Sequence, residues 1–327
     1  MVSSAEGQTM RAVVADRYGG PEVLRFADVA VPTPGPGEVR IRIEATSINL
    51  SDWEGLVGSP YYARIGGLRA PARPILGSDI AGHVEAVGPD VTEFAVGDAV
   101  YGDNLERKGG FAAAVVAPVS VLAPLPAGLS FAAASTVPQA GSIAVAAAGL
   151  ASAGDRVALN GGGGGTGAFA IPLLKAVGAH VTGVDNVAKL EFMRSLGADA
   201  VVDHRREDYT RAVPPFDLIV DLVARRSVFA YRRALADGGR YACVGGPVRT
   251  MLRVLTAGSV IGRLSGRRIG VLAVPSGPEH FAPLGERVAA GEIDAHIDRR
   301  IGLDEVPEAL AAVGAGEVLG KVVVEPS

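Results

Sequence analysis

The sequence predicts an α/β protein of two domains, one a β-barrel-like domain and the other a doubly wound parallel sheet. Up to about residue 126, short strands are separated by Gly- and Pro-rich turns, which is typical of an all-β domain. Beyond it, strands alternate with helices, which is the pattern of a parallel sheet covered on both faces. A run of five glycines, 161–165, follows the first strand of this second region.

The first region is assigned as a β domain because apolar and polar side chains alternate along it. Residues 39–48 alternate apolar and polar side chains, which predicts a strand with one buried face. Pro124 to Pro126 mark the change to the second pattern. In this region we expect strands at 10–16, 22–30, 39–48, 74–87 and 98–101.

The second region opens with helices at 130–137 and 139–150 and then alternates. Its expected strands are 155–160, 180–184, 200–203, 217–222, 239–244 and 268–274. Its expected helices are 166–177, 187–196, 226–236 and 250–262. A last helix at 278–290, a strand at 294–300, a helix at 304–313 and a strand at 321–325 are expected to return to the first domain.

The glycine run fits a dinucleotide-binding fingerprint. With Gly162, Gly164 and Gly167 at the three fingerprint positions, the glycines allow a tight turn, close approach of a pyrophosphate and close helix packing. A strand precedes the loop and a helix follows it, as the fingerprint requires. The helix N-terminus offers free N–H groups to a phosphate. Gly165 and Thr166 complete the expected phosphate loop.

Asp185 ends the second strand of this unit and favours NADH over NADPH. A carboxylate there can accept hydrogen bonds from ribose hydroxyls and repels a 2′-phosphate. Three cations nearby, Lys189, Arg205 and Arg206, are the alternative, because they can hold that phosphate. Asp185 is otherwise interpreted as a surface turn or helix cap.

Composition excludes several other classes of protein. The net charge of −4 and the pI near 5.8 argue against a nucleic-acid partner. A single cysteine, Cys243, excludes an internal disulfide and a multi-cysteine zinc site. The start of the sequence lacks the features of a signal peptide, and the apolar stretch 131–150 is interrupted by Pro138 and Gly141. We therefore expect a cytoplasmic protein without a membrane partner.

Several segments resemble the medium-chain dehydrogenase/reductase superfamily, and within it the zinc-independent, zeta-crystallin-like quinone oxidoreductases. They are GSDIAGHVEAVGPDVTEFAVGDAVYG (77–102), SINLSDW (47–53), PYY (60–62), PILGSD (74–79) and GKVVV (320–324), together with the glycine loop. The segments at 60–62 and 74–79 also resemble reductases related to mitochondrial reticulon-interacting proteins. The likeness runs from about residue 10 to 325.

This resemblance implies a fold, an activity and an assembly. It implies a GroES-like catalytic domain at 1–126, completed by 291–327, and a Rossmann domain at 127–290. It implies hydride transfer from NAD(P)H to a quinone or an α,β-unsaturated carbonyl, and a homodimer joined at the edge strand near 268–274. Zinc-containing members carry zinc ligands at positions that correspond to Asn49, Ser78 and about Gln139, and none of these three is a good zinc ligand. We therefore expect no metal.

Most of the expected cofactor contacts lie at strand ends. The stretch Asp221, Leu222 and Val223 ends one strand, and Gly245 and Gly246 follow the next. Ligands bind at this edge of such sheets. The resemblance adds Asn49 beside the nicotinamide, and Lys321 as a cofactor contact or an ordinary strand-edge lysine. The family often carries threonine and glycine where this chain has Ile143 and Ala224.

Without a metal, hydrogen-bond donors must assist at the substrate oxygen. The candidates are Asn49, Ser51, Tyr61 and Tyr62. Asn49 and Asp52 match the family's Asn-x-x-Asp motif, and Asp52 is either catalytic or orients its own loop. Either tyrosine can donate a proton or simply wall the pocket.

Two alternative functions remain open from the sequence. One is a stand-alone enoyl or tailoring reductase of a natural-product pathway, which the loop at 54–73 would decide. The other is a low-turnover NAD(P)H-binding redox sensor, which the departures at Ile143 and Ala224 suggest.

Overall fold

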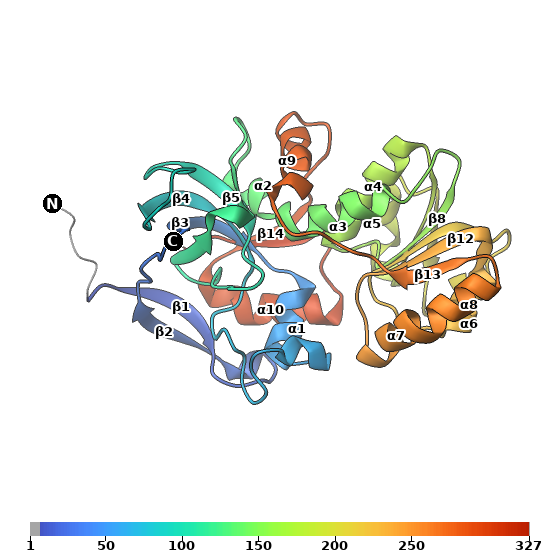
Figure 1. The fold of residues 1–327 in the computed structure, drawn as a ribbon, viewed down its shortest axis with the longest axis horizontal. Helices are drawn as coiled ribbons and strands as arrows, with labels where there is room; N and C mark the ends of the chain where they lie inside the picture. Colours follow the sequence, from blue (N-terminus) through green and yellow to red (C-terminus); the bar gives the residue numbers. More distant parts are fainter. Residues whose placement is uncertain (1–6, 327) are drawn as a thin grey trace. The chain divides into compact units, whose positions relative to one another are not determined.

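The computed structural model describes residues 7–326, which form two compact units. Unit 1 contains the chain up to Ala140 and from Ser276 onward, and unit 2 contains Gly141–Pro275. The expected α/β class, with a barrel-like domain and a doubly wound sheet, is confirmed (Figure 1).

Unit 1 is built on a seven-stranded sheet in which β14, β15, β3, β4, β5 and β7 are successive neighbours and β6 pairs with β3. A separate hairpin joins β1 to β2. The strands are β1 (Thr9–Ala15), β2 (Leu24–Ala30), β3 (Glu38–Ser47), β4 (Asp79–Val87), β5 (Ala99–Asp103), β6 (Ala114–Pro118), β7 (Leu122–Pro124), β14 (Ile297–Ile301) and β15 (Lys321–Val324). The helices are α1 (Leu50–Val57), α2 (Phe131–Ser135), α9 (Ala282–Ala289) and α10 (Val306–Ala315).

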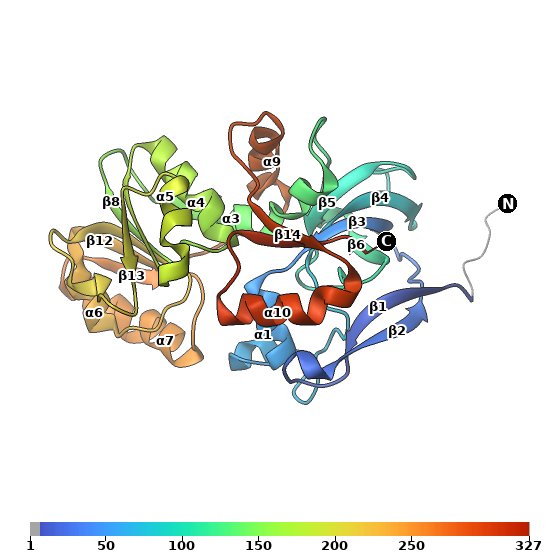
Figure 2. The same ribbon diagram turned by 180° about the vertical axis from the view of Figure 1, so that it is seen from behind.

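The end of the chain completes the core of unit 1. Helices α1 and α10 lie side by side in both views (Figures 1 and 2), although they are far apart in the sequence. Leu56 of α1 and Leu310 of α10 are fully buried in one apolar cluster with Val322 of β15. Strand β15 is therefore held on both sides, between β14 and β3.

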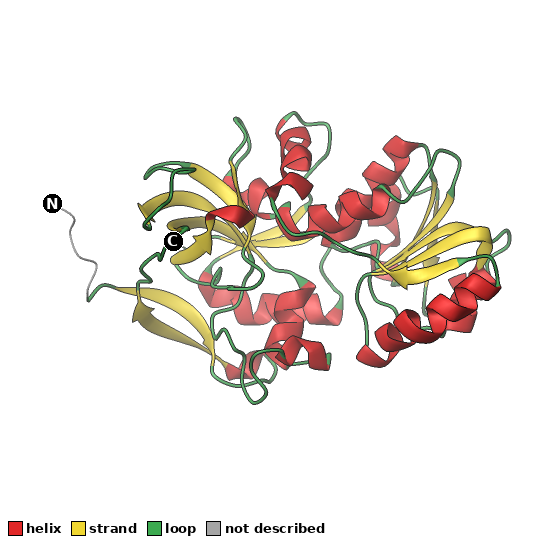
Figure 3. Cartoon of the chain, in the orientation of Figure 1, coloured by secondary structure: helices red, strands yellow, loops and turns green. Residues whose placement is uncertain are grey.

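Unit 2 is a six-stranded parallel sheet with the order β10, β9, β8, β11, β12 and β13. This is the doubly wound order in which the first strand lies at the centre. Helices cover both faces of the sheet (Figure 3). The strands are β8 (Arg156–Asn160), β9 (His180–Asp185), β10 (Ala200–Asp203), β11 (Phe216–Asp221), β12 (Leu235–Cys243) and β13 (Arg268–Val271). The helices are α4 (Gly165–Val177), α5 (Leu190–Ser195), α6 (Val228–Ala234), α7 (Val248–Arg253) and α8 (Ser259–Leu264); α3 (Pro138–Ala148) spans the unit boundary.

The structure differs from the expected elements in a few places. Helix α1 was not predicted, because its sequence holds Gly55 and only two turns of weak periodicity. Strands β6 and β7 were also missed. The unit boundaries differ from 126 and 291, because α2 packs on β3 and β4 and Phe281 packs edge-on against Tyr101. Among the described residues, the helices are too short or too polar to span a bilayer.

Candidate functional sites in the two units

The glycine loop of unit 2 leaves open space beside the N-terminus of α4. A Cβ built on Gly164 would meet no atom closer than 3.8 Å, and the backbone there is extended, so a side chain would be tolerated by the fold. By contrast, a Cβ on Gly167 would lie 2.0 Å from the carbonyl oxygen of Gly162. Gly167 therefore serves close packing, whereas Gly164 borders the space that a phosphate requires.

The partly exposed surface of this loop is made by Gly164, Gly165 and Thr166, which begin α4. First-turn N–H groups have no partner inside a helix, so they are available to an anion. A Cβ on Gly162 would lie 3.0 Å from the Met193 sulfur, so this glycine also permits packing. The residues fit a dinucleotide pyrophosphate.

Asp185 is tied to the glycine loop. Its carboxylate accepts hydrogen bonds from the backbone N–H of Gly163 at 3.0 Å and of Asn186 at 2.8 Å. Lys189 is buried with its aliphatic stem against Gly163, and a Cβ there would lie 2.6 Å from it. Arg205 and Arg206 are exposed. Asp185, the predicted acceptor for the ribose hydroxyls, thus also holds the glycine loop in place through Gly163.

Asp221 lies beneath the strand ends as a scaffold. It is fully buried, and its carboxylate accepts hydrogen bonds from Asn160 Nδ2 at 2.7 Å and Tyr241 Oη at 3.0 Å. It also accepts the backbone N–H of Val223 at 3.2 Å. Burial raises its pKa, and these donors oppose the rise. The predicted contact between Asp221 and the cofactor is not seen for its side chain, because the carboxylate is buried and its hydrogen bonds are made to Asn160, Tyr241 and Val223.

The neighbouring turns remain accessible to a ligand through their backbone. Leu222, Val223, Gly245 and Gly246 are partly exposed, and Ala224 N–H donates to Gly245 O at 2.9 Å. A Cβ on Gly245 would lie 2.9 Å from Leu222 O, and Gly246 has a φ of +144°. Glycine at both positions is therefore required by the way the two turns approach each other.

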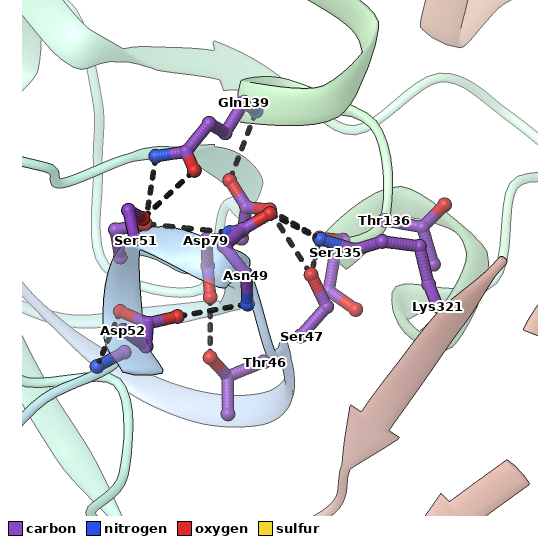
Figure 4. Close-up of polar contacts among 12 residues, drawn as sticks. Thr46, Ser47, Asn49, Ser51, Asp52, Asp79, Ser135, Thr136, Gln139 and Lys321 are labelled. Carbon is purple, nitrogen blue, oxygen red and sulfur yellow. Dashed lines mark hydrogen bonds and ion pairs between the residues drawn. The ribbon is translucent and has the colours of Figure 1, made fainter. Parts of the chain in front are cut away.

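In unit 1, strand register gathers a buried polar cluster. Ser47 of β3 lies opposite Asp79 of β4, and Asp79 lies opposite Asp103 of β5. The Asp79 carboxylate accepts hydrogen bonds from Ser47 Oγ at 3.0 Å and from the backbone N–H of Gln139 at 3.0 Å (Figure 4). It is the centre of the network and is fully buried.

Asn49 and Lys321 close this network. Asn49 Nδ2 donates to Asp79 at 2.8 Å, and its Oδ1 accepts a hydrogen bond from Lys321 Nζ. Lys321 also forms an ion pair with Asp79 at 3.2 Å and is only 3% exposed. Both polar atoms of Asn49 are therefore engaged inside the unit, which differs from the expected donation to substrate. The Lys321 ammonium likewise points into this cluster.

Asp52 orients its loop. Its carboxylate accepts the backbone N–H groups of Asn49 at 2.9 Å and Gly77 at 3.2 Å, and it pairs with Lys108 Nζ at 3.1 Å. It is fully buried, and of its two predicted roles these contacts support the loop-orienting one.

A chain of three hydrogen-bonded side chains, Ser51, Gln139 and Ser78, runs beside this network, and we call it the relay. Ser51 Oγ donates to Gln139 Oε1 at 2.9 Å, and Gln139 Nε2 donates to Ser78 Oγ at 3.3 Å. Ser78 is buried, whereas Ser51 and Gln139 are partly exposed (Figure 4 labels both).

Asp103 is the least satisfied carboxyl of unit 1. Its Oδ1 is buried without a hydrogen-bond partner among the described residues. Burial, and after it the charge of Asp79, raises the pKa of Asp103 to about 7, while Lys108 opposes the rise.

The two tyrosines differ. Tyr61 is 79% exposed, with Arg64 over its ring. Tyr62 Oη lies 3.3 Å from the Glu54 carboxylate, and burial raises the pKa of Glu54 to about 7. Tyr62 thus contacts a half-buried carboxyl, whereas Tyr61 faces solvent within unit 1.

The residues at the zinc-ligand positions do not fit zinc. The structure brings Asn49, Ser78 and Gln139 together, with Asn49 Nδ2 and Gln139 Nε2 at 3.5 and 3.3 Å from Ser78 Oγ. They offer two amides and a hydroxyl, whereas zinc requires thiolate, imidazole or carboxylate. Among residues 7–326, no group of three His, Cys, Asp or Glu is placed to hold a metal.

Two parts of the chain match known families. Residues 35–127 match the alcohol dehydrogenase GroES-like domain, and residues 196–324 match the zinc-binding dehydrogenase family. With the fold and the glycine loop, these matches define the class: the chain belongs to the medium-chain dehydrogenase/reductase superfamily. Its place within that class is the quinone oxidoreductase branch.

Individual relatives span the whole chain. The chloroplastic quinone-oxidoreductase QR1 of Triphysaria versicolor is 31% identical, covering 98% of this chain and 99% of the relative. The 2-methylene-furan-3-one reductase of Solanum lycopersicum is 29% identical, covering 97% and 79%. The solved quinone oxidoreductase of Coxiella burnetii has a TM-score of 0.88 at 28% identity, covering 98% and 100%.

Sequence reasoning recognised Asp52 and Lys321 but missed the other charged residues of the unit 1 cluster. Asp79 and Ser78 stand in the quoted segment PILGSD, which was the one available signal. Asp103, Lys108 and Glu54 belong to no motif, and only strand pairing and burial show their importance.

Proposed function

We propose that this protein is an NAD(P)H-dependent oxidoreductase that transfers hydride to a quinone or an α,β-unsaturated carbonyl. The observation that carries this proposal is the glycine loop between β8 and α4, where Gly164 borders open space in a doubly wound sheet. Relatives named as quinone oxidoreductase and methylene-furanone reductase support the choice of acceptor.

The chemistry divides between cofactor and protein. When bound, the reduced nicotinamide supplies the hydride, and one solvent-derived proton completes reduction of quinone to hydroquinone. The protein contributes donors at the oxygen where charge develops. Ser51 and Gln139 are the polar side chains of the relay that are partly exposed, so we assign them to the substrate oxygen. The buried network of Asn49, Asp79 and Lys321 holds Ser78 and Gln139 in place by hydrogen bonds.

The cofactor preference follows from Asp185. Its carboxylate lies at the end of β9 and is held by Gly163 N–H, so its charge is fixed where the ribose of a bound cofactor would lie. The 2′-phosphate of NADPH would be repelled by that carboxylate. We therefore propose NADH as the preferred reductant.

The reaction is proposed to be independent of zinc. The support is the donor chemistry of Asn49, Ser78 and Gln139, which satisfy one another by hydrogen bonds. We also propose a cytoplasmic homodimer. Strand β13 ends the order of the unit 2 sheet, so its outer edge can pair with a second copy.

The direct test is a parallel titration of the purified protein with NADH and NADPH, followed by addition of 1,4-benzoquinone. We expect tighter binding of NADH and rapid oxidation when quinone is added. Binding without oxidation by quinones, but with oxidation by enones, would assign the enoyl reductase alternative. Binding without any turnover would assign the sensor alternative, and no binding would overturn the proposal.

A further inference from the structure

The helical segment 248–264 of unit 2 has a face that neither the glycine loop nor the unit 1 cluster uses. The segment consists of α7, one π-helical turn (Val254–Gly258) and α8 in direct succession. Its buried residues recur every four positions, and they are Thr250, Val254, Gly258 and Gly262. A Cβ on Gly258 would lie 2.9 Å from Ile269 Cγ2 of β13, so this buried row packs closely on the strand. The opposite side of the segment therefore faces away from the sheet.

That opposite side exposes apolar side chains. A step of two residues turns an α-helix by about 200°. The row opposite the buried one therefore contains Leu252, Thr256, Val260 and Leu264. Leu252 is 55% exposed, Val260 58% and Leu264 85%. The outer face of a surface helix normally carries polar side chains, so an apolar row there indicates an interaction surface.

Arginines flank the apolar row. Arg249, Arg253 and Arg263 are all exposed. Residues 238–275 contain six arginines and no Asp or Glu, and the preceding Asp237 is paired with Arg267 at 2.9 Å. The positive charge beside the apolar row is therefore not neutralised by carboxylates of its own segment.

Helix α6 adds to this surface. It contacts α8 and the π-helical turn, and it lies with α7 and α8 on one side of the unit 2 sheet in both views (Figures 1 and 2). Phe229 of α6 is 68% exposed, and Arg232 is exposed as well. We call the exposed side chains of segment 248–264, together with Phe229 and Arg232, the basic apolar face.

Unit 2 is basic although the whole chain is acidic. It contains 17 Lys and Arg against 10 Asp and Glu, whereas unit 1 contains 14 against 25. The net charge of −4 therefore conceals a separation of charge between the two units. Such an asymmetry within one chain is typical of proteins that bind an anionic surface.

We propose that the basic apolar face docks on the surface of an anionic lipid bilayer. Leu252, Val260 and Leu264 enter the boundary between headgroups and acyl chains, and the arginines beside them reach the headgroup phosphates. The segment lies in the plane of the membrane, which agrees with described helices that are too short or too polar to span it. Docking of this kind is independent of the proposed reductase reaction.

This docking bears on the expectation that the protein has no membrane partner. That expectation depends on the lack of a signal peptide and of a spanning segment in the sequence. A helix that lies on a membrane needs neither, and a cytoplasmic protein can dock from that side.

Other occupants of the basic apolar face fit it less well. A two-fold contact with a second copy would bring the same arginines face to face, where like charges repel. A nucleic acid would pair with the arginines, but its phosphate backbone offers no apolar surface to Leu252 and Leu264. A bilayer offers negative headgroups and an apolar interior within reach of one helix.

Sedimentation of the full-length protein with lipid vesicles tests the docking. We expect binding to vesicles of equal parts phosphatidylcholine and phosphatidylglycerol, and binding at least about tenfold weaker to phosphatidylcholine alone. Added salt should also weaken the binding, because it screens exposed charges. Equal binding to both kinds of vesicle, or binding to neither, would overturn the proposal.

Two variants separate the contributions of charge and of apolar contact. Arg253→Gln should weaken binding to the anionic vesicles about fivefold, and Leu264→Gln should weaken it about tenfold. The matched controls are Arg194→Gln, at an exposed arginine of α5, and Val96→Gln, at a 64% exposed side chain of unit 1. Both controls should bind like the wild type. A loss in a control as large as in its counterpart would show that the basic apolar face is not the docking surface.

Insertion of the apolar row can be observed directly, because Cys243, the one cysteine of the chain, is buried. A nitrobenzoxadiazole label on the new thiol of Leu264→Cys should shift its emission to the blue when anionic vesicles are added. The same label on Val96→Cys should not shift. Adsorption of the protein without the blue shift at position 264 would contradict the proposal, since the apolar row would then remain in water.

The mass of the protein in solution identifies contact with a second copy. We expect the same mass for the wild type and for Leu264→Gln. A dimer that becomes a monomer in Leu264→Gln would instead assign the face to contact between copies. NADH oxidation by 1,4-benzoquinone should be unchanged in this variant, so a failure of docking and a failure of the proposed reductase function are separate results.

Discussion

Two buried aspartates show how differently the two units use charge. Asp79 in unit 1 and Asp221 in unit 2 are both fully buried at strand ends, and each accepts four hydrogen bonds. The donors of Asp79 include the Lys321 ammonium, whereas those of Asp221 are an amide, two phenols and a backbone N–H.

The difference separates a polar network built around an ion pair from a scaffold held by uncharged donors. An ion pair fixes the charge of Asp79, and around it Asn49, Ser78 and Gln139 are ordered by hydrogen bonds. In unit 2 the charge at Asp221 is disfavoured, as its raised pKa shows, and the ligand site is made by backbone and open space at the glycine loop. We propose that side chains prepare the chemistry in unit 1, whereas open space at the glycine loop prepares cofactor binding in unit 2.

The largest effect is expected from filling the open space of unit 2. Gly164→Val should leave folding intact, since the nearest atom lies 3.8 Å from a Cβ, but should weaken NADH binding more than about 100-fold by occupying the phosphate space. Fluorescence titration with NADH measures this. Gly167→Ala is the matched contrast and should unfold the unit, because its Cβ would clash with Gly162 O. Unchanged NADH affinity in folded Gly164→Val would remove the loop from the site.

Removing the cation of unit 1 should have the next largest effect. Lys321→Met leaves the Asp79 charge buried and unpaired, which should lower the free energy of unfolding by about 3 kcal/mol. The double variant Lys321→Met with Asp79→Asn should recover part of that loss. Denaturant unfolding monitored by Trp53, the one tryptophan and a residue of unit 1, reports on this. A loss below about 0.5 kcal/mol would contradict an essential ion pair.

A tenfold effect is expected at the loop carboxylate. Asp185→Asn keeps an acceptor for Gly163 N–H but removes the charge, so the ratio of kcat/KM for NADH over NADPH should fall about tenfold, or about 1.4 kcal/mol. Steady-state kinetics with both cofactors measures that ratio. An unchanged ratio would remove Asp185 from the selection of the cofactor.

The free-energy cost of burying the Asp103 carboxyl in unit 1 should depend on pH. The folded-state pKa of Asp103 is raised, so its ionisation penalises the folded state progressively as pH rises from about 4 to about 7. Asp103→Asn should therefore gain about 3 kcal/mol over the wild type at about pH 8.5 relative to about pH 4.5. Urea unfolding at the two pH values measures it, and a gain that is equal at both would show that Asp103 does not titrate in this range.

The smallest effect is expected at the scaffold aspartate. Asp221→Asn can keep the bonds from Asn160 and Val223 through its oxygen and can donate to Tyr241 through its nitrogen. We expect a change of less than about 1 kcal/mol in the free energy of unfolding. A loss as large as that of Lys321→Met would erase the distinction between the two aspartates.

These two regions also differ in how far the sequence alone predicts them. The glycine loop is contiguous, so strand, turn and helix signals identify it, and Gly164 and Gly167 were both recognised. The unit 1 cluster is assembled from β3, β4, β5, α3 and β15. Register between strands places Ser47, Asp79 and Asp103 in one row, and no local pattern encodes that register.

The direction in which side chains point is the second property that the sequence alone does not predict. Asn49, Asp52 and Lys321 were recognised through family motifs, but the motifs do not say that their polar atoms satisfy one another. Gln139 was noted only as a position where zinc enzymes carry a ligand. Its place between Ser51 and Ser78 depends on where α3 begins relative to β4, which is a tertiary property.

The central claim is that hydrogen bonds in unit 1 take the place of a metal in activating the acceptor. The most direct measurement is the rate of NADH oxidation by 1,4-benzoquinone after exhaustive dialysis against EDTA, compared with the same protein supplied with zinc. We predict rapid oxidation at equal rates in both samples. Oxidation that disappears after dialysis and returns with zinc would contradict the claim.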